Sequence, residues 1–321
     1  MKAQSARPGL PAPSLNWLLG QMPLVALVVL CVVASLLSGR FLSGININNV
    51  LMQGAVMTVI AIGMTYVIIA GGFDLSVGSV VALSGCIAAM VMVEAGIAAG
   101  VLAGIAVGAA VGLMNGLIVT KLDVNPFIAT LATMVLLRGV TMLVTDSQPM
   151  SGEDGLPALF NDFALARLFG LPYMVWLPIV IFAACHWLLH HTAYGIRLFA
   201  TGGNRDAAFL AGIAVGRVKT SAYVLCGTLA GIAGVMLASR VQSGQPTAGI
   251  LYELTAIAAV VLGGASLHGG EGKLYKSVIG VFIIIVLSNA LNLANVHSYW
   301  QQVAIGVVLI AAAAADRLRR R

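Results

Sequence analysis

Long apolar runs separated by short polar segments constrain this chain more than any other feature of its sequence. Each run has about 17 to 23 residues, the length that an α-helix needs to cross about 30 Å of hydrocarbon. Since 60% of the residues are hydrophobic and 9% are charged, a soluble core wrapped in polar surface is excluded. The runs lack the alternation of a membrane β-barrel. The sequence therefore predicts an all-α, polytopic membrane protein with about ten transmembrane helices.

We expect these helices to form a single transmembrane domain over residues 22–315. The expected ranges are 22–38, 49–70, 75–93, 97–119, 126–145, 174–189, 218–239, 253–267, 275–294 and 299–315. No small-residue cleavage site follows the first apolar run, so we interpret residues 1–21 as a retained cytoplasmic tail. Residues 316–321 are expected to form a basic cytoplasmic tail.

The basic residues test this topology, because cytoplasmic loops of membrane proteins are enriched in lysine and arginine. With ten crossings and both termini inside, the loops on the cytoplasmic side are 71–74, 120–125, 190–217 and 268–274. Of the 17 Lys and Arg residues, the outer side then holds only Arg40, Arg138, Arg167 and Arg240. The basic pI therefore reflects topology, and nucleic-acid binding is not indicated.

The external, periplasmic loop 146–173 is acidic and contains an amphipathic stretch, ALFNDFALARLF. We expect this stretch to lie along the outer membrane surface. The loop is longer than a simple connection needs, so a docking surface and a plain linker both remain open.

A polar interruption within 190–217 reads TAYGIRLFATGGNRDAAFLAGI at 192–213. Asn204 is a good helix N-cap, Asp206 suits the first turn, and Gly212 supplies a stop, so a short helix from Arg205 to Gly212 is expected. That helix presents small apolar side chains and one bulky one, namely Ala207, Ala208, Leu210, Ala211 and Phe209. They fit either a groove in a partner protein or the lipid headgroup layer.

Glycine patterns mark packing and possible moving parts. The helix at 97–119 has a glycine at every fourth position, which lets another backbone approach closely in lipid: Gly100, Gly104, Gly108, Gly112 and Gly116. Two clusters near the cytoplasmic face, GGFDLSVGS at 71–79 and GGASLHGGEG at 263–272, can break helices at membrane depth. The candidate gate residues there are Gly71, Gly72, Asp74, Gly263 and Gly264. Asp74 is expected to cap the following helix rather than bind an ion.

Neutral amides gather near the outer ends of the last two helices. Such groups donate and accept hydrogen bonds without adding charge, as a neutral polyhydroxylated solute requires, although they also cap helix ends. Arg138 lies near the outer end of its helix, where it either snorkels outward or faces a pathway. The candidate pathway and substrate residues are Asn115, Arg138, Ser288, Asn289, Asn292 and Gln301.

Several site types are not indicated by the sequence. There is no G-x-x-x-x-G-K-[ST] motif, so the chain has no phosphate-binding loop for ATP hydrolysis. The four cysteines lie inside apolar runs without CxxC spacing and are expected to be buried core residues, and the five histidines form no spaced metal constellation. We therefore expect no cofactor, no metal and no catalytic residue.

Five ordered blocks resemble the integral-membrane permease subunits of bacterial sugar ABC importers of the ribose, xylose and arabinose type. They are AIGMTYVIIAGGFDLSVGS at 61–79, NGLIVTKLDVNPFIATLATMVLLRG at 115–139, YGIRLFATGGNRDAAFLAGI at 194–213, SGQPTAGILYELTAIAAVVLGGASLHGGEG at 243–272 and SNALNLANVHSYWQQV at 288–303. The resemblance implies a multi-pass permease of the bacterial inner membrane that carries a monosaccharide such as ribose or xylose inward. It also implies a second permease subunit, an ABC ATPase subunit on the cytoplasmic side and a periplasmic sugar-binding protein.

The resemblance places an ATPase-coupling helix between the sixth and seventh helices. The residues that it assigns to coupling are Gly202, Gly203, Asn204, Arg205, Ala207, Ala208, Leu210 and Gly212. An alternative function from another class of protein is that of a secondary transporter driven by an ion gradient. That alternative predicts an ionisable residue or an unwound helix at the membrane midplane, whereas the acids here fall at helix ends.

Overall fold

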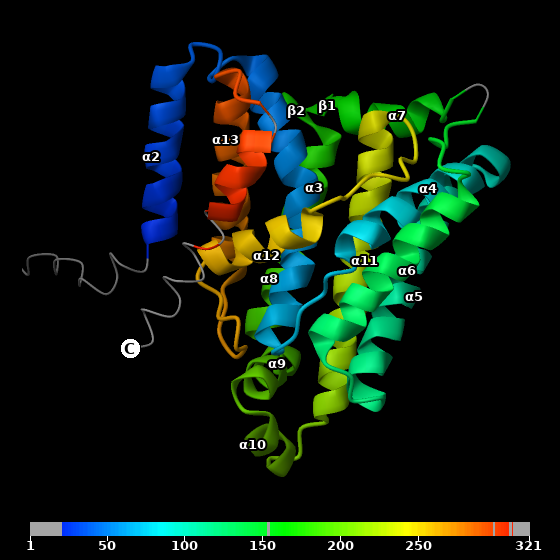
Figure 1. Ribbon diagram of the computed structural model, residues 1–321, viewed down its shortest axis with the longest axis vertical. Helices are drawn as coiled ribbons and strands as arrows, with labels where there is room; N and C mark the ends of the chain where they lie inside the picture. The colour runs from blue at the N-terminus through cyan, green and yellow to red at the C-terminus, as the bar shows by residue number, and fades with distance from the viewer. Residues whose placement is uncertain (1–20, 153–154, 298, 308–309, 311–321) are drawn as a thin grey trace, which may run out of the picture.

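The computed structural model describes residues 21–152, 155–297, 299–307 and 310. The elements appear in Figure 1. They are α2 (Met22–Leu37), α3 (Gly44–Ile69), α4 (Val77–Ala95), α5 (Ile97–Lys121), α6 (Pro126–Val144), α7 (Ala158–Leu165), β1 (Arg167–Leu168), β2 (Leu171–Pro172), α8 (Tyr173–His191), α9 (Ala193–Gly203), α10 (Arg205–Leu210), α11 (Val215–Val241), α12 (Tyr252–Leu262) and α13 (Leu274–Leu293). The tails predicted at 1–21 and 316–321 lie outside the described residues, except for residue 21.

Each of the ten predicted helices corresponds to a helix in the described part of the chain, with residues 299–307 representing the tenth. Seven helices in the described ranges are long and apolar enough to cross a membrane: α3, α4, α5, α6, α8, α11 and α13. The prediction for 253–267 is wrong in length, because α12 has 11 residues and rises only about 16 Å. It therefore reaches about halfway across the hydrocarbon.

The bundle is arranged around α3. Of its most apolar stretch of 18 residues, 89% is buried by the rest of the chain. Every residue from Gly54 to Ile69 is buried. Figure 1 shows α2 and α13 on one side of α3, with α4, α5 and α6 on the other and α11 running through the middle. Because α3 is apolar on all faces, only a position inside the bundle buries it fully.

The connections alternate between the two ends of the bundle, as ten crossings require. The α2–α3 turn, α7 and the β1–β2 hairpin lie at the upper end in Figure 1, and α9 and α10 project from the lower end. The amphipathic stretch predicted in the outer loop forms α7, which buries Phe160 and Ala164. The hydroxyl of Ser239 on α11 donates to the carbonyl of Phe160 at 2.5 Å and fixes α7 to the bundle.

The glycine ladder of α5 is a packing surface, as predicted. A Cβ on Gly108 would lie 2.3 Å from the carbonyl oxygen of Gly227 on α11, and a Cβ on Gly227 would lie 2.3 Å from that of Gly108. Gly112 and Gly116 meet the α11 backbone at Tyr223 and Thr220 in the same way. The two helices therefore touch backbone to backbone, and only glycine permits that approach.

Helices α4 and α12 begin halfway between the ends of the bundle (Figure 1). Residues 70–76 rise from the lower end of α3 to the start of α4, and residues 242–251 descend from the upper end of α11 to the start of α12. We call these segments the lower break and the upper break. Non-helical backbone at this depth must be enclosed by protein or line a cavity.

Candidate functional site

The polar interruption folds as two consecutive helices, α9 and α10, separated by Asn204. The predicted cap is confirmed, because Asn204 Oδ1 accepts a hydrogen bond from the Ala207 amide at 2.9 Å. The expected C-terminus at Gly212 is wrong by two residues, since α10 ends at Leu210 and Gly212 follows with φ of +80°. The Ile213 amide donates back to the Ala208 carbonyl at 3.0 Å and closes the turn.

The side chains of α10 point in two directions. Ala208 is buried within this chain, with 4% of its surface exposed. Phe209 and Leu210 are 70% and 85% exposed, and Ala207 and Ala211 are also exposed. Figure 1 places α10 at the lowest point of the fold. The apolar surface available to a partner is therefore formed by Phe209 and Leu210, and Ala208 belongs to the internal packing of the loop.

Helix α9 was not predicted, and it fastens α10 to the bundle. Its inner face is Gly195, Leu198 and Thr201, spaced at one helical turn. The Tyr194 ring stacks on Tyr66 of α3 with centroids 6.2 Å apart, and its hydroxyl accepts a hydrogen bond from Ser221 Oγ at 3.1 Å. Burial raises the pKa of the Tyr194 phenol above its usual range, so it remains neutral.

Backbone from three segments meets at the end of α9. A Cβ on Gly202 would lie 1.7 Å from the Ile69 carbonyl oxygen and 2.6 Å from the Gly270 nitrogen. The Gly270 amide donates to that same Ile69 carbonyl at 2.9 Å. Gly269 also approaches Gly71 closely, since a Cβ on Gly269 would lie 2.8 Å from the Gly71 Cα. We call this contact the glycine junction: Gly71, Gly202, Gly203, Gly269 and Gly270.

The predicted gate residues divide between the junction and other contacts. Gly71 lies in the junction, whereas a Cβ on Gly72 would lie 2.5 Å from the Tyr223 hydroxyl. Gly263 ends α12 and packs against the Lys276 backbone of α13, and Gly264 follows with φ of +84°. The glycines that reach α9 are instead Gly269 and Gly270, from the same cluster.

Asp74 organises the lower break. Its Oδ1 accepts hydrogen bonds from the Ser76 amide at 2.9 Å and the Ser76 hydroxyl at 2.6 Å, and so it shapes the turn that leads into α4. Asn115 Nδ2 on α5 donates to Ser76 Oγ at 2.9 Å and approaches Asp74 Oδ1 at 3.5 Å. The Tyr223 hydroxyl donates to the Phe73 carbonyl at 3.0 Å. Asn115, predicted to line a pathway, is thus fully buried in a network that holds the break.

Arg138 secures the upper break and does not snorkel outward. Its Nη1 donates to the carbonyls of Pro246 and Ala248 at 2.8 and 2.9 Å. A Cβ on Gly78 would lie 2.2 Å from the Gly249 carbonyl oxygen and 2.4 Å from the Glu253 carboxylate. The starts of α4 and α12 therefore touch, with Arg138 and buried Glu253 beside the contact. Sequence reasoning missed Gly78, Gly249 and Glu253, because partners so distant in the chain leave no local signal.

The amides predicted on the last helices do not gather around Arg138. Asn289 pairs with Asn46 of α3 through two hydrogen bonds, of 2.9 and 2.7 Å. Gln301 donates to the Val296 carbonyl at 3.1 Å, Asn292 is exposed, and Ser288 is half-buried. Helices α6 and α13 lie on opposite sides of α3 and α11 (Figure 1). The structure thus separates the predicted pathway residues into two groups.

Comparison with known proteins places the chain in a family. Residues 46–313 match the family model described as the permease component of a branched-chain amino acid transport system. The chain belongs to this permease family. The permease is 45% identical over 306 residues to the ribose import permease protein RbsC of Escherichia coli K12, covering 95% of each chain. It is 46% identical over 296 residues to RbsC of Bacillus subtilis, covering 92% of each.

A third relative is named for a different sugar. The permease is 39% identical over 299 residues to the L-arabinose transport system permease protein AraH of E. coli K12, covering 93% of this chain and 90% of the relative. No solved structure matches. Membership in the family makes the chain a multi-pass transport subunit and not an enzyme, in agreement with the missing phosphate-binding loop.

Proposed function

We propose that this permease is the membrane subunit of an ATP-driven importer that moves a monosaccharide, a pentose such as ribose, from the periplasm to the cytoplasm. The family description names amino acids, but the relatives that match over nearly the full length are sugar permeases. Ribose and L-arabinose are both neutral pentoses. The shared chemistry is therefore a small polyhydroxylated solute without charge.

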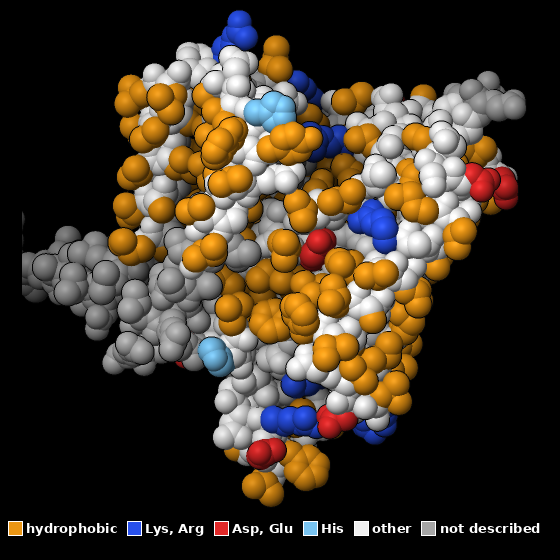
Figure 2. All heavy atoms as spheres, in the orientation of Figure 1, with side chains coloured by type: hydrophobic (Ala, Val, Ile, Leu, Met, Phe, Trp, Pro, Cys, Tyr) orange, Lys and Arg blue, Asp and Glu red, His pale blue; other side chains and the backbone are white. Residues whose placement is uncertain are grey.

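The observation that carries the proposal is the exposed apolar tip of α10, together with the backbone contacts that join α9 to the lower break and to the segment after α12. Phe209 and Leu210 are exposed on α10 beyond the end of the bundle. Figure 2 shows hydrophobic atoms gathered at this lowest point of the surface. Through α9 and the glycine junction, α10 connects to the lower break at Gly71 and to the segment after α12 at Gly270. An ATPase bound to this tip would therefore act on the backbone of the lower break and of the segment after α12.

We propose the following assembly, which the exposed tip of α10 and the sugar permeases among the relatives support. An ABC ATPase subunit docks on α10 at the cytoplasmic end, and both termini of the chain lie on that side. A second permease, identical or paralogous, completes the pathway, and a periplasmic sugar-binding protein docks on the opposite end over loop 146–173. In this arrangement the lower break and the segment after α12 are the parts that move, and the proposed gate region remains Gly71, Gly72, Asp74, Gly263 and Gly264.

An ion-gradient transporter is the second candidate, and one observation favours it. Asp74 and Glu253 are buried near the starts of α4 and α12, and both helices begin at mid-depth beside non-helical backbone. Ion-coupled transporters use acidic residues in this arrangement. Energy dependence separates the two. Uptake by the ATP-driven importer stops when ATP is depleted and persists when the ion gradients alone are collapsed, and a secondary transporter shows the reverse.

The test of the docking step is Leu210→Asp. If α10 docks in an apolar groove, this change buries an unpaired carboxylate there, at a cost of several kcal/mol. We expect the ATPase subunit to dissociate and pentose uptake to fall by more than tenfold together, while the permease still inserts. Uptake of radiolabelled ribose and co-purification of the ATPase measure the two effects.

Two further variants make the test specific. Leu210→Met keeps an apolar side chain of similar volume and is expected to retain ATPase binding and uptake. Leu159→Asp places the same charge on exposed α7 at the opposite end and should leave ATPase binding unchanged. Ala208 is not a suitable position for this test, because its side chain is buried inside this chain and a substitution there would disturb the loop itself. Wild-type uptake by Leu210→Asp with the ATPase bound would show that α10 is only an interfacial helix.

A further inference from the structure

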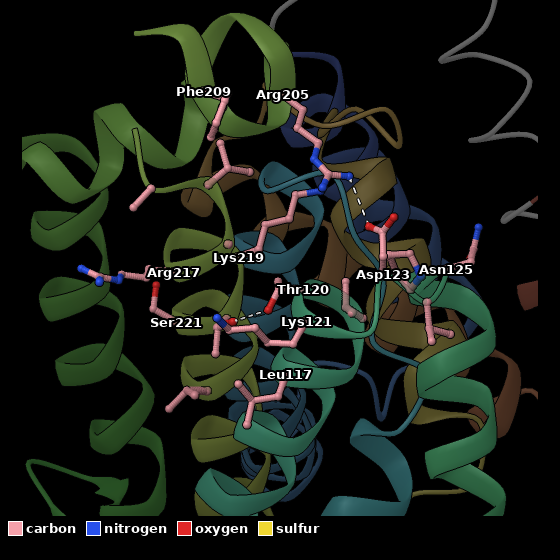
Figure 3. A pocket seen from close by; sticks show the side chains of 18 of the residues that line it. Leu117, Thr120, Lys121, Asp123, Asn125, Arg205, Phe209, Arg217, Lys219 and Ser221 are labelled. Carbon is pink, nitrogen blue, oxygen red and sulfur yellow. Dashed lines mark hydrogen bonds and ion pairs between the residues drawn. The ribbon is translucent and has the colours of Figure 1, made fainter. Parts of the chain in front are cut away.

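A large cavity lies behind α10, and the proposed ATPase contact involves only one of its lining residues, Phe209. Its volume is about 1220 Å³, and its walls come from the end of α5, residues 123–126, α10, and residue 214 with the first turns of α11. Figure 3 shows that Arg205 and Lys219 extend toward one another across the end nearest α10, while Leu117 lies toward the bundle.

The charges in this cavity do not balance. Four basic side chains line it, Lys121, Arg205, Arg217 and Lys219, against two acidic ones, Asp123 and Asp206. Arg205 forms an ion pair with Asp123 at 3.6 Å, but the two side chains are 63% and 79% exposed, so this pair contributes little. Asp123 also attracts Lys219, while Arg205 repels it, so this one carboxylate faces two cations. The cavity therefore holds a surplus of positive charge that an anion would neutralise.

The opposite end of the cavity is apolar. Leu117 lies at this end (Figure 3). The lining also includes the apolar side chains of Val119 and Val224 and the hydroxyl groups of Thr120 and Ser221. A second, shallower groove of about 510 Å³ shares Leu117 and Lys121 with the cavity. That groove continues along the outer face of α5 over Leu113, Met114 and Ile118. The charged cavity thus adjoins an apolar groove on the outer face of α5.

We propose that this cavity binds an anionic phospholipid from the leaflet on the α10 side. Its phosphate lies between Lys219 and Arg205, and an acyl chain follows Leu117 and the groove on α5. Basic pockets between membrane helices take such headgroups because each cation near the surface attracts the anionic lipid. Free phosphate carries the same anionic group, but it has no acyl chain to fill the apolar groove on α5. The bound lipid would brace α10 against α5 and α11.

The test uses the purified full-length permease and native mass spectrometry. The probes are dioleoylphosphatidylglycerol, dioleoylphosphatidylcholine and inorganic phosphate. We expect phosphatidylglycerol to stay bound, phosphatidylcholine to dissociate, and phosphate to leave phosphatidylglycerol in place. Lys219→Gln and Arg205→Gln should each weaken phosphatidylglycerol binding about fivefold, which corresponds to about 1 kcal/mol for each removed charge.

Control variants distinguish loss of the lipid site from misfolding and from a general loss of positive charge. Arg197→Gln removes the same charge from an exposed residue of α9 outside the cavity and should leave binding unchanged. Lys219→Arg keeps the charge and should retain binding. Leu117→Asn should weaken phosphatidylglycerol without creating a preference for phosphate.

Three results would overturn the proposal. Equal binding of the two lipids would show that the cations do not select the head. Displacement of phosphatidylglycerol by phosphate would reduce the site to an adventitious ion only. If the Gln variants keep the lipid but lose the ATPase subunit, the cavity is a protein-docking surface. Since none of the lipid measurements involves sugar uptake, they stand or fall separately from the transport function.

Discussion

Two neighbouring glycines of α9 should respond in opposite ways to the same substitution. In Gly202→Ala, the new Cβ would lie 1.7 Å from the Ile69 carbonyl oxygen and 2.6 Å from the Gly270 nitrogen. In Gly203→Ala, the nearest atom is the Gly270 Cα at 4.0 Å, which is an ordinary contact. Both residues are helical, so the two variants differ in their surroundings and share their intrinsic helix propensity.

The magnitude follows from the geometry of the glycine junction. An ordinary contact needs at least 3.4 Å, so the Ile69 carbonyl and α9 must separate by about 1.7 Å. The obstructing atoms belong to the backbone, so no side-chain rotation relieves the clash. Overpacking costs about 1 to 3 kcal/mol, and losing the 2.9 Å bond from Gly270 to Ile69 adds about 1 to 3 kcal/mol. Gly203→Ala avoids both costs and gains up to about 1 kcal/mol of helix propensity.

Thermal unfolding in detergent measures the difference. Cys86, Cys185 and Cys226 are buried, so a fluorogenic thiol reagent reports the transition as these side chains become accessible. We expect Gly202→Ala to unfold at a lower temperature than wild type, and Gly203→Ala at the same or a higher temperature. If the two variants unfold together, or Gly202→Ala is as stable as wild type, the close backbone contact inferred for the junction is wrong.

The remaining predictions concern packing, topology and catalysis. Gly108→Leu should separate α5 from α11 and reduce accumulation in the membrane, because its Cβ would meet the Gly227 carbonyl at 2.3 Å; normal accumulation with no transport would instead assign the ladder to the pathway. Single cysteines at the exposed positions Leu159 and Ile196, in a Cys31→Ala background, should label from opposite faces of the membrane, Leu159 from the periplasm, and labelling from one face would mean a miscounted crossing. The purified permease should hydrolyse no ATP, and hydrolysis that survives removal of contaminants would contradict its assignment as a transport subunit.

The membrane helices were predictable because each one appears in the sequence as an apolar run of a suitable length. The apolar runs identify all ten, and the ladder at 97–119 identifies the close packing of α5. Helix ends were less predictable. Helix α3 begins at Gly44, five residues before the expected start, because Ser43 Oγ accepts a hydrogen bond from the Asn46 amide at 3.3 Å and caps a polar first turn. In sequence, that turn resembles a loop.

Helix α9 was missed because its end carries two adjacent glycines, which usually indicate a loop. In the structure Gly202 is required for close approach of another backbone, and its conformation is helical. A local pattern does not distinguish these two uses of glycine. The hydrogen bonds from Arg138 to Pro246 and Ala248 are unpredictable for a related reason, since they join residues more than a hundred positions apart.

The position of α12 explains why these contacts involve backbone. This helix is too short to cross the membrane, so its two ends must be held by other parts of the bundle. At its start, Gly249 touches Gly78 of α4, and Arg138 holds the preceding carbonyls. Beyond its end, Gly270 bonds to Ile69 and packs on Gly203. Side chains at these contacts would absorb a displacement by changing rotamer, whereas backbone in direct contact transmits it. A movement of α9 would therefore reach the segment after α12 with little loss, and we expect α12 to move as a rigid unit with the lower break.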